Sequence, residues 1–330
     1  MSTPIPASSR ATHPPALPLV MAASTLVLWA SAFVAIRHLQ DVPPGALALG
    51  RTAVGTVVLA VFLLVRRVRT RRPMVVPRGR DWLPVVTVGV LWFGVYMVAL
   101  NAAEQRVDAG TASMLVQISP IVIAVLAVLF LGERPHRGLF IGLAVAFAGV
   151  ILIGFATSSG DGRGDLLGVL LVLLAAVVYA VSVIAQKPVL ARVPALDMTF
   201  FACLIGTVAC LPFSGQLVSI IGTTPAGNLW WIGYLGVFPT AVAFTTWAVA
   251  LTAMSASSLG VTTYLVPLIT VLLAWLLLSE TPPWLAFVGG VLSLIGVGIA
   301  RRRPRVDPAL RAHSDSAPAS PTMRRGRSGR

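Results

Sequence analysis

Ten apolar stretches, each close to 20 residues long, follow one another along the chain and constrain its fold more than any other feature. They lie at approximately 17–37, 44–65, 82–103, 108–131, 137–155, 166–187, 197–219, 229–251, 256–279 and 283–300. A helix needs about 20 apolar residues to cross a hydrocarbon core about 30 Å thick. Backbone groups inside lipid must be satisfied within their own segment, so such stretches are helices. The sequence therefore predicts an all-α polytopic membrane protein with ten transmembrane helices.

The charge content agrees with a membrane location. Only 11% of the 330 residues are charged and 57% are hydrophobic, whereas a soluble domain carries about 25% charged residues. The net charge of +14 would suit a nucleic acid, but the Arg residues gather in short clusters between the apolar stretches. They do not form one basic face with interleaved base-stacking aromatics. We therefore expect the lipid bilayer as a partner and no nucleic acid.

Basic residues in the connections predict the orientation. If the N-terminus is cytoplasmic, the inner connections carry 11 Lys or Arg residues and the outer ones carry 3. The inner residues are Arg66, Arg67, Arg69, Arg71, Arg72, Arg78, Arg80, Arg134, Arg137, Lys187 and Arg192, and the outer ones are Arg37, Arg106 and Arg163. Cytoplasmic loops carry such an excess of basic residues. We expect a multi-pass protein of the inner (plasma) membrane with both termini in the cytoplasm.

The two cysteines indicate neither a disulfide nor a metal site. Cys203 and Cys210 are seven residues apart in one apolar stretch. On a helix this separation is roughly 10 Å, which is too far for a disulfide bond. We expect two small buried side chains, and we predict no cofactor and no metal.

The two halves of the chain repeat each other. Pro120 and Glu133 recur 147 residues later as Pro267 and Glu280. Further pairs at this offset are Ala109 and Ala256, Pro135 and Pro282, Gly142 and Gly289, and Gly149 and Gly296. Upstream, at an offset of 150, the pairs are Trp29 and Tyr179, Arg37 and Lys187, and Pro44 and Pro194.

This repeat predicts the domain organisation. Two five-helix halves, 17–155 and 166–300, are joined by a Gly- and Asp-rich linker at 156–165. Residues 1–16 and the basic residues 301–330 are expected to be disordered tails. Because five is an odd number, the second half enters the membrane in the opposite orientation. Inverted repeats of this kind are a transporter architecture that can open to either side.

Several motifs resemble the EamA-type transporters of the drug/metabolite transporter superfamily. They are Trp29-Ala-Ser-Ala-Phe33 with Arg37, Arg51, Ser119-Pro120 with Leu131-Gly132-Glu133, and Val266-Pro267 with Glu280. The resemblance covers about 17–300. It implies a ten-helix fold with two EamA-like repeats and cytoplasmic termini, and frequently the export of amino acids or related metabolites. It also implies a central cavity lined mainly by helices 1, 3, 4, 6, 8 and 9.

One pair of matched positions is predicted to contact the substrate. Gln117 corresponds to Tyr264, and each precedes its matched proline by three residues. A polar residue near mid-span is costly unless it faces protein or water, and an interhelical hydrogen bond is the alternative. Pro120 and Pro267 remove a backbone donor and are predicted to be hinges that bend their helices; the alternative is a passive kink.

Aromatic and basic residues within the stretches are further candidates for substrate binding. Trp29, Tyr96, Tyr179 and Trp247 are predicted to line the cavity, and the alternative is core packing or lipid contact. Arg51 lies about two turns inside the second stretch and is predicted to be a counter-charge for a substrate carboxylate. The alternatives are snorkelling to the headgroups or a structural bond to a neighbouring helix.

Other residues are predicted to be structural. Glu133 and Glu280 close their helices and should pair locally, because a carboxylate is unfavourable at a helix C-terminus. Asn101 and Glu104, near the outer end of the third stretch, are expected at a solvated loop edge, and the alternative is that they line the outer mouth of the cavity. Four glycines at matched spacings of seven residues should be helix-packing positions outside the cavity. These are Gly142, Gly149, Gly289 and Gly296.

The apolar stretches also exclude some functions. They carry no mid-span Asp or Glu and no GxxxxGK[ST] motif, so neither cationic drugs nor ATP hydrolysis is expected. We predict a secondary transporter, an exporter of small neutral or zwitterionic amino-acid-like metabolites that works by alternating access. The alternative is a non-transporting multi-span protein, either an enzyme or an assembly factor. An enzyme would need titratable groups that converge in a cavity. The sequence leaves a monomer and a homodimer equally open.

Overall fold

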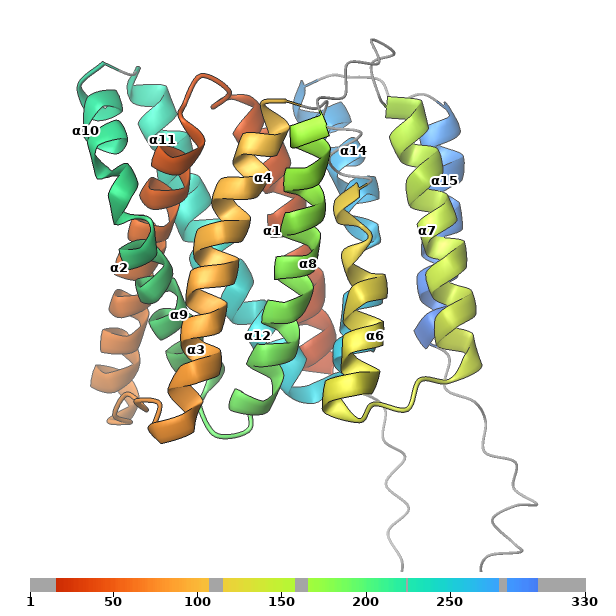
Figure 1. Cartoon of the computed structure of the whole chain (residues 1–330), viewed down its shortest axis with the longest axis horizontal. Coiled ribbons are helices and arrows are strands. Elements are labelled where there is room, and N and C mark those ends of the chain that lie inside the picture. Colours follow the sequence, from red (N-terminus) through yellow and green to blue (C-terminus); the bar gives the residue numbers. More distant parts are fainter. Residues whose placement is uncertain (1–15, 107–114, 158–165, 224, 279–283, 302–330) are drawn as a thin grey trace, which may run out of the picture.

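A computed structural model describes residues 16–106, 115–157, 166–223, 225–278 and 284–301 of the chain. Every regular element in these ranges is a helix and none is a strand. Figure 1 shows the helices standing side by side as one bundle. The predicted linker at 156–165 and the two predicted tails fall almost entirely outside the described residues.

The helical elements follow the predicted apolar stretches. In the first half of the chain they are α1 (Ala16–Arg37), α2 (Pro44–Thr70), η1 (Gly79–Asp81), α3 (Trp82–Val88), η2 (Gly89–Tyr96), α4 (Met97–Glu104), α6 (Ser119–Leu131) and α7 (Arg137–Thr157). In the second half they are α8 (Leu166–Val189), α9 (Ala195–Ala209), η3 (Leu211–Phe213), α10 (Ser214–Thr223), α11 (Ala226–Leu235), η4 (Gly236–Val242), α12 (Ala243–Ala253), α13 (Ala256–Thr262), α14 (Leu265–Leu278) and α15 (Trp284–Arg301).

Among the described residues, six helical segments are long and apolar enough to cross a membrane. They are Ala16–Ile36, Pro44–Thr70, Gly79–Glu104, Leu166–Val189, Ala226–Ala253 and Ala256–Leu277. The pair Ala195–Ala209 and Leu211–Thr223, bent by 49°, would make a seventh. Three described apolar helices are shorter: Ser119–Leu131, Arg137–Ile153 and Phe287–Ala300. These lengths and compositions are those of a polytopic membrane protein.

Apolar side chains cover the outside of the bundle as well as its interior. Val57 and Leu64 on α2, Phe130 on α6 and Leu276 on α14 are all largely exposed. A helix that is apolar on every side needs an apolar environment all round. The exposed faces therefore suit contact with lipid chains rather than with water.

The bundle has two ends that differ in their connections. At the lower end in Figure 1, α2 is joined to η1 (residues 71–78), α8 to α9 (190–194) and α12 to α13 (254–255). At the upper end, α1 is joined to α2 through residues 38–43.

Two of the long segments contain π-helical stretches. η2 begins at Gly89 and η4 begins at Gly236, and the difference, 236 − 89 = 147, equals the offset of the sequence repeat. A π-helical stretch interrupts the regular hydrogen-bond ladder and is frequent at functional sites. Both stretches adjoin residues that line the central cavity described below.

Glycines bring α7 and α15 together at one edge of the bundle (Figure 1). A Cβ atom on Gly149 would lie 2.5 Å from the Gly289 carbonyl oxygen, and one on Gly289 would lie 2.6 Å from that of Gly149. A Cβ atom on Gly142 or Gly296 would likewise come within 2.5 Å of the facing backbone. Only glycine allows backbones to approach this closely. The predicted helix-packing role of the four glycines is confirmed.

The matched prolines lie just after interruptions of their helices. Residues 117–118 form a turn before α6, and residues 263–264 form a turn before α14. Pro120 and Pro267 then occupy the first turn of the new helix, where a missing N–H costs no helical hydrogen bond. The prolines therefore mark breaks in the two helices, while a hinge motion there stays a prediction.

Candidate substrate cavity

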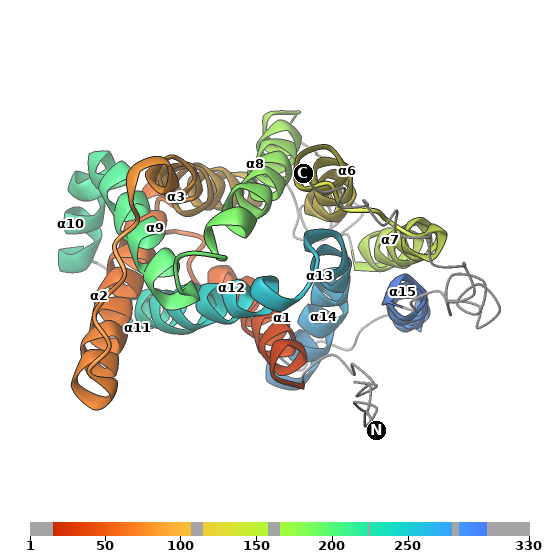
Figure 2. The same ribbon diagram turned by 90° about the horizontal axis from the view of Figure 1, so that it is seen from below.

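The centre of the bundle is surrounded by helices from both halves of the chain. Viewed along the helix axes in Figure 2, α1, α3, α8, α12 and α13 lie around the middle. The α7–α15 pair and α10 lie at opposite edges in both views. The central helices contact one another, as α1 does with α12 and α14, and α8 with η2.

A cavity that encloses about 670 Å³ of space, part of it open to solvent, lies among these central helices. It is lined by Trp29, Ala32, Phe33, Ile36, Arg51, Trp92, Tyr96, Met97, Leu100, Val116, Gln117, Ser119, Tyr179, Phe244, Thr263 and Val266.

The cavity extends from the middle of the bundle toward the upper end. Ile36 is one residue from the end of α1 at that side, and Arg51 is seven residues after the start of α2. Leu100 is four residues before the end of α4. Tyr179 and Phe244, by contrast, lie near the middle of their long segments.

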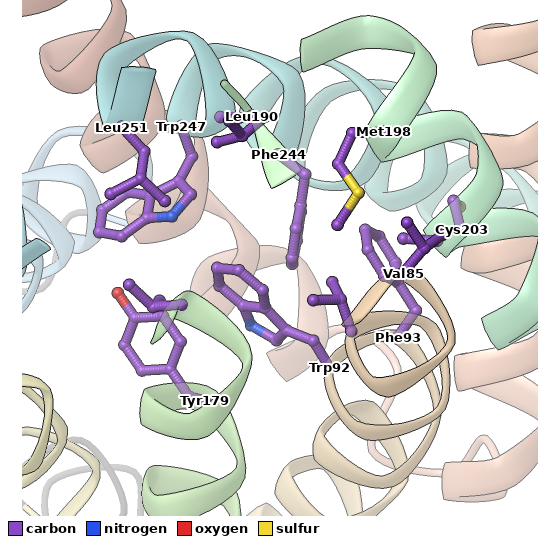
Figure 3. Close-up of a cluster of buried hydrophobic side chains, with 14 of the residues drawn as sticks. Val85, Trp92, Phe93, Tyr179, Leu190, Met198, Cys203, Phe244, Trp247 and Leu251 are labelled. Carbon is purple, nitrogen blue, oxygen red and sulfur yellow. The ribbon is translucent and has the colours of Figure 1, made fainter. Parts of the chain in front are cut away.

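An aromatic cluster closes the cavity toward the lower end. The Trp29 ring lies 5.4 Å from Phe244, 6.0 Å from Tyr179 and 6.1 Å from Trp92, measured between ring centres, in edge-to-face arrangements. Figure 3 shows Trp92, Tyr179, Phe244 and Trp247 directed toward one another from three segments. Such ring pairs are each worth about 0.5–1.5 kcal/mol beyond their buried area. The cluster forms a rigid apolar wall.

Arg51 is the one charged residue among those lining the cavity. Its side chain is only 4% exposed, so it does not snorkel to the surface. Its Nε donates to Thr240 Oγ1 of η4 at 3.2 Å. In the described part of the chain, this is the only protein acceptor of the guanidinium, and the terminal N–H groups are left for a ligand. Arg51 thus makes one structural bond and also faces the cavity.

The repeat pair Gln117 and Tyr264 is divided by the structure. Gln117 lines the cavity and is 3% exposed. Tyr264 is fully buried outside the cavity lining, with its ring centre 6.2 Å from that of Phe147 on α7. Its neighbour Thr263 lines the cavity instead. Thr263 and Tyr264 lie in the turn between α13 and α14. Side chains of successive residues point about 100° apart even in a regular helix, so only one of these two side chains can face the cavity.

The predicted aromatic residues also separate into two groups. Trp29, Tyr96 and Tyr179 line the cavity. Trp247 does not; it is fully buried behind Trp29, with the ring centres 5.0 Å apart. Trp92 and Phe244 also line the cavity, although neither is among the residues predicted to do so. Trp92 lies within η2 and Phe244 lies just after η4, and the apolar pattern of the sequence does not reveal these π-helical stretches.

Asn101 and Glu104 are not at a solvated edge, so that prediction is wrong. Asn101 is 3% exposed, and its Nδ2 donates to the Pro44 carbonyl oxygen at 3.3 Å. Asn101 Oδ1 and Glu104 Oε1 are buried and have no hydrogen-bond partner among the described residues. The reason is that α4 packs against both α2 and α8.

Two side chains close the lower end beneath the aromatic cluster. Lys187 Nζ donates to the carbonyl oxygens of Leu251 and Met254 at the end of α12. Glu133 accepts the backbone N–H of Ala256 at 2.6 Å, at the start of α13. A cation at a helix C-terminus and an anion at an N-terminus both complement the helix dipole. Glu133 is therefore paired, but with the other half of the chain and not locally as predicted, while Glu280 lies outside the described residues.

The cysteines and metal-ligating groups form no further site where the structure describes them. Cys203 and Cys210 are free and buried. In the described ranges, no group of three or more His, Cys, Asp or Glu side chains could hold a metal ion.

A helical membrane bundle around an apolar cavity with one buried cation is typical of a membrane transport protein for small molecules. The sequence profile of the EamA-like transporter family matches residues 16–155 and again residues 166–302. The chain belongs to the EamA-like transporter family. It is therefore a multi-pass membrane transporter with a small-molecule substrate rather than an enzyme, which excludes the non-transporting alternative.

Curated relatives that are named as transporters match this chain over most of their length. The chain is 38% identical to a probable terminal-alkyne amino-acid exporter of Streptantibioticus cattleyicolor, over 84% of this chain and 91% of the relative. It is 31% identical to an uncharacterized transporter of Bacillus subtilis, over 82% and 86%. It is 27% identical to a pseudopaline exporter of Pseudomonas aeruginosa, over 77% and 84%.

A solved crystal structure shares the fold. It superposes with a TM-score of 0.69 and 20% sequence identity, over 91% of this chain and 99% of that one. At this identity the likeness concerns the fold alone.

Proposed function

We propose that this chain is a secondary transporter that exports small amino-acid-like metabolites by alternating access through the central cavity. The observation that carries the proposal is the buried Arg51 in an otherwise uncharged cavity. A buried guanidinium with free N–H groups suits a carboxylate, which it binds through two parallel hydrogen bonds. The names of two relatives, which are exporters, support the direction and the substrate class.

We further propose ten transmembrane helices in two inverted repeats, 17–155 and 166–300. The six long segments, the bent pair and the three shorter helices fall on the ten predicted stretches. The two matches to the family profile and the two π-helical stretches 147 residues apart support the repeat. The basic residues favour a cytoplasmic lower end and cytoplasmic termini, in the inner membrane.

The proposed roles of the site residues follow from their positions. Arg51 binds the substrate carboxylate, and Gln117 offers the amide as a neutral polar contact. Trp29, Tyr96 and Tyr179 pack against the apolar part of the substrate. Trp247 supports Trp29 from behind. Thr263, and not Tyr264, is the residue of this pair that can contact the substrate, and Tyr264 packs against α7.

Alternating access requires the lower end to open when the upper end closes. The helix interruptions before Pro120 and Pro267 lie beside the cavity, at residues 117–118 and 263–264. Weakened helical hydrogen bonding there allows the two parts of each helix to move separately. We propose that these two positions supply the flexibility for the change.

The test is the transport of a panel of radiolabelled apolar L-amino acids into inverted membrane vesicles. Arg51→Gln should reduce transport about 10- to 100-fold, because a hydrogen bond to a charged group contributes about 1.5–3 kcal/mol. Arg69→Gln is the matched control, since Arg69 is exposed near the end of the same helix. Equal transport by wild type and Arg51→Gln would contradict the proposed site. No transport of any panel member by wild type would contradict the proposed substrate class.

A further inference from the structure

The charges of the cavity lining are unbalanced. Arg51 is cationic, and no Asp or Glu is among the lining residues in the described part of the chain. A zwitterionic amino acid carries one positive and one negative group, so a site that matches both would offer one charge of each sign. The described lining residues offer only the positive one. The imbalance points to the part of the substrate that the site recognises.

The oxygen atoms that the described lining residues offer to an ammonium group are all neutral. The hydroxyls of Ser119 and Thr263 donate to carbonyl oxygens three residues earlier, both at 2.8 Å, and keep their lone pairs as neutral acceptors. Gln117, Tyr96 and Tyr179 remain as neutral polar groups. A neutral oxygen does not compensate for the loss of water around a buried charge.

The aromatic wall is also poorly arranged for a cation. An ammonium group is attracted to the open face of an aromatic ring. The Trp29 ring instead meets Trp92, Tyr179 and Phe244 at interplanar angles of 63°, 87° and 64°. In such edge-to-face pairs, ring edges cover neighbouring ring faces. The wall therefore presents an apolar surface suited to a hydrocarbon group.

The nearest acidic side chain on the same helix face is Glu104. It follows Tyr96 and Leu100 at intervals of four residues, toward the upper end, but it does not line the cavity. A substrate with its carboxylate on Arg51 and its apolar body against the aromatic wall would extend away from Glu104, toward the middle of the bundle.

We infer that the cavity recognises a carboxylate and an apolar body, and that the α-ammonium group of an amino acid contributes little to binding. The inference rests on the proposed function and makes it more specific. The substrate class then includes apolar monocarboxylates and N-acylated amino acids as well as apolar amino acids. Compounds that keep the ammonium group but lack the carboxylate are excluded.

The test compares matched ligands on the purified wild-type protein. The first series is L-phenylalanine, N-acetyl-L-phenylalanine, 3-phenylpropionate and L-phenylalaninamide, and the second is L-norvaline, pentanoate and L-norvalinamide. Binding is followed by tryptophan fluorescence, because Trp29 and Trp92 line the cavity. We expect the deaminated acids to bind within about threefold of the amino acids, and the amides to bind at least about tenfold more weakly.

Two variants identify the groups responsible. Arg51→Gln should weaken all the carboxylates by about tenfold or more, and Glu104→Gln should leave the affinity for L-phenylalanine unchanged. Binding of the amino acids with tenfold weaker binding of the deaminated acids would overturn the inference and leave the proposed function standing. Weaker binding of L-phenylalanine alone in Glu104→Gln would also overturn it. If no ligand of either series binds, the proposed function fails, and the inference fails with it.

Discussion

The lower and upper ends of the bundle differ in how their buried charged groups are paired, although Arg66 Nε and Gln186 Oε1 at the lower end also lack a hydrogen-bond partner among the described residues. At the lower end, Asp197 is fully buried and accepts both terminal nitrogens of Arg66, at 2.6 and 2.8 Å, and the Val75 N–H at 2.8 Å. At the upper end, the terminal N–H groups of Arg51, Asn101 Oδ1 and Glu104 Oε1 have no protein partner among the described residues.

This difference separates stability from function. A buried carboxylate that accepts several hydrogen bonds holds one arrangement rigidly, whereas buried polar groups without partners are costly unless a ligand or water binds them. Asp197 therefore fixes the connections between helices at the lower end, and we propose that the Arg51 guanidinium stays available to a substrate at the upper end. Substitutions at the lower end should change the free energy of unfolding, and those around the cavity should change binding.

The largest effect is expected at Asp197. Asp197→Ala removes the acceptor of two Arg66 nitrogens and of the Val75 N–H. The loss should be about 3 kcal/mol of folding free energy, because each hydrogen bond to a charged group contributes about 1.5–3 kcal/mol and water can reach the Arg66 side chain, which is 22% exposed. The measurement is thermal unfolding of the protein in detergent, together with the yield of monodisperse protein. Asp81→Asn is the control, because its partner Arg192 is 59% exposed and an exposed pair of this kind contributes little to stability. Equal drops in unfolding temperature for Asp197→Ala and Asp81→Asn would contradict the larger contribution expected of the Arg66–Asp197 pair.

A smaller loss is expected where α7 meets α15. The Cβ atom in Gly149→Ala would lie 2.5 Å from the Gly289 carbonyl oxygen, and overpacking of this kind costs about 1–3 kcal/mol. Gly298→Ala on α15 is the matched control, because a Cβ atom there has nothing within 4 Å. Gly149→Ala should lower the unfolding temperature and leave substrate affinity unchanged in the folded protein. Lost affinity at normal stability would show that α7 takes part in the site.

At the cavity, Gln117→Leu should act on binding alone. A typical net hydrogen bond contributes about 0.5–1.5 kcal/mol, so affinity should fall about two- to tenfold. Transport measured across substrate concentrations reports the effect on binding, and an unfolding curve of the same variant reports any effect on stability. An unchanged half-saturation concentration would show that Gln117 lines the cavity without contacting the substrate.

The smallest effect is expected at Tyr264. Its buried hydroxyl has no hydrogen-bond partner in the described part of the chain, and it does not line the cavity. Tyr264→Phe should therefore leave affinity unchanged and keep or slightly raise stability, by up to about 1 kcal/mol. If the two positions were equivalent, as the repeat alone predicts, then Gln117→Leu and Tyr264→Phe would both weaken substrate binding. Measuring the two variants side by side decides between the repeat and the observed packing.

Much of the fold was determined by the sequence itself. The lengths of the apolar stretches predict the helices, because the bilayer thickness and the need to satisfy backbone groups leave no other choice. The seven-residue spacing of Gly142 and Gly149 predicts a close helix contact, since only glycine lets backbones approach. Pro120 and Pro267 predict interruptions, because proline has no N–H to donate. These are local properties of single helices.

Only the tertiary structure decided which side chains reach the cavity. A residue's position along a helix fixes its direction relative to that helix, but the rotation of the helix is set by the neighbours against which it packs. In lipid the outside is as apolar as the interior, so the apolar pattern does not show which face points inward. For this reason the sequence could not show that Thr263 lines the cavity in place of Tyr264, or that Asn101 and the Glu104 Oε1 atom are buried. It is also why Arg51 found Thr240, 189 residues away in the chain.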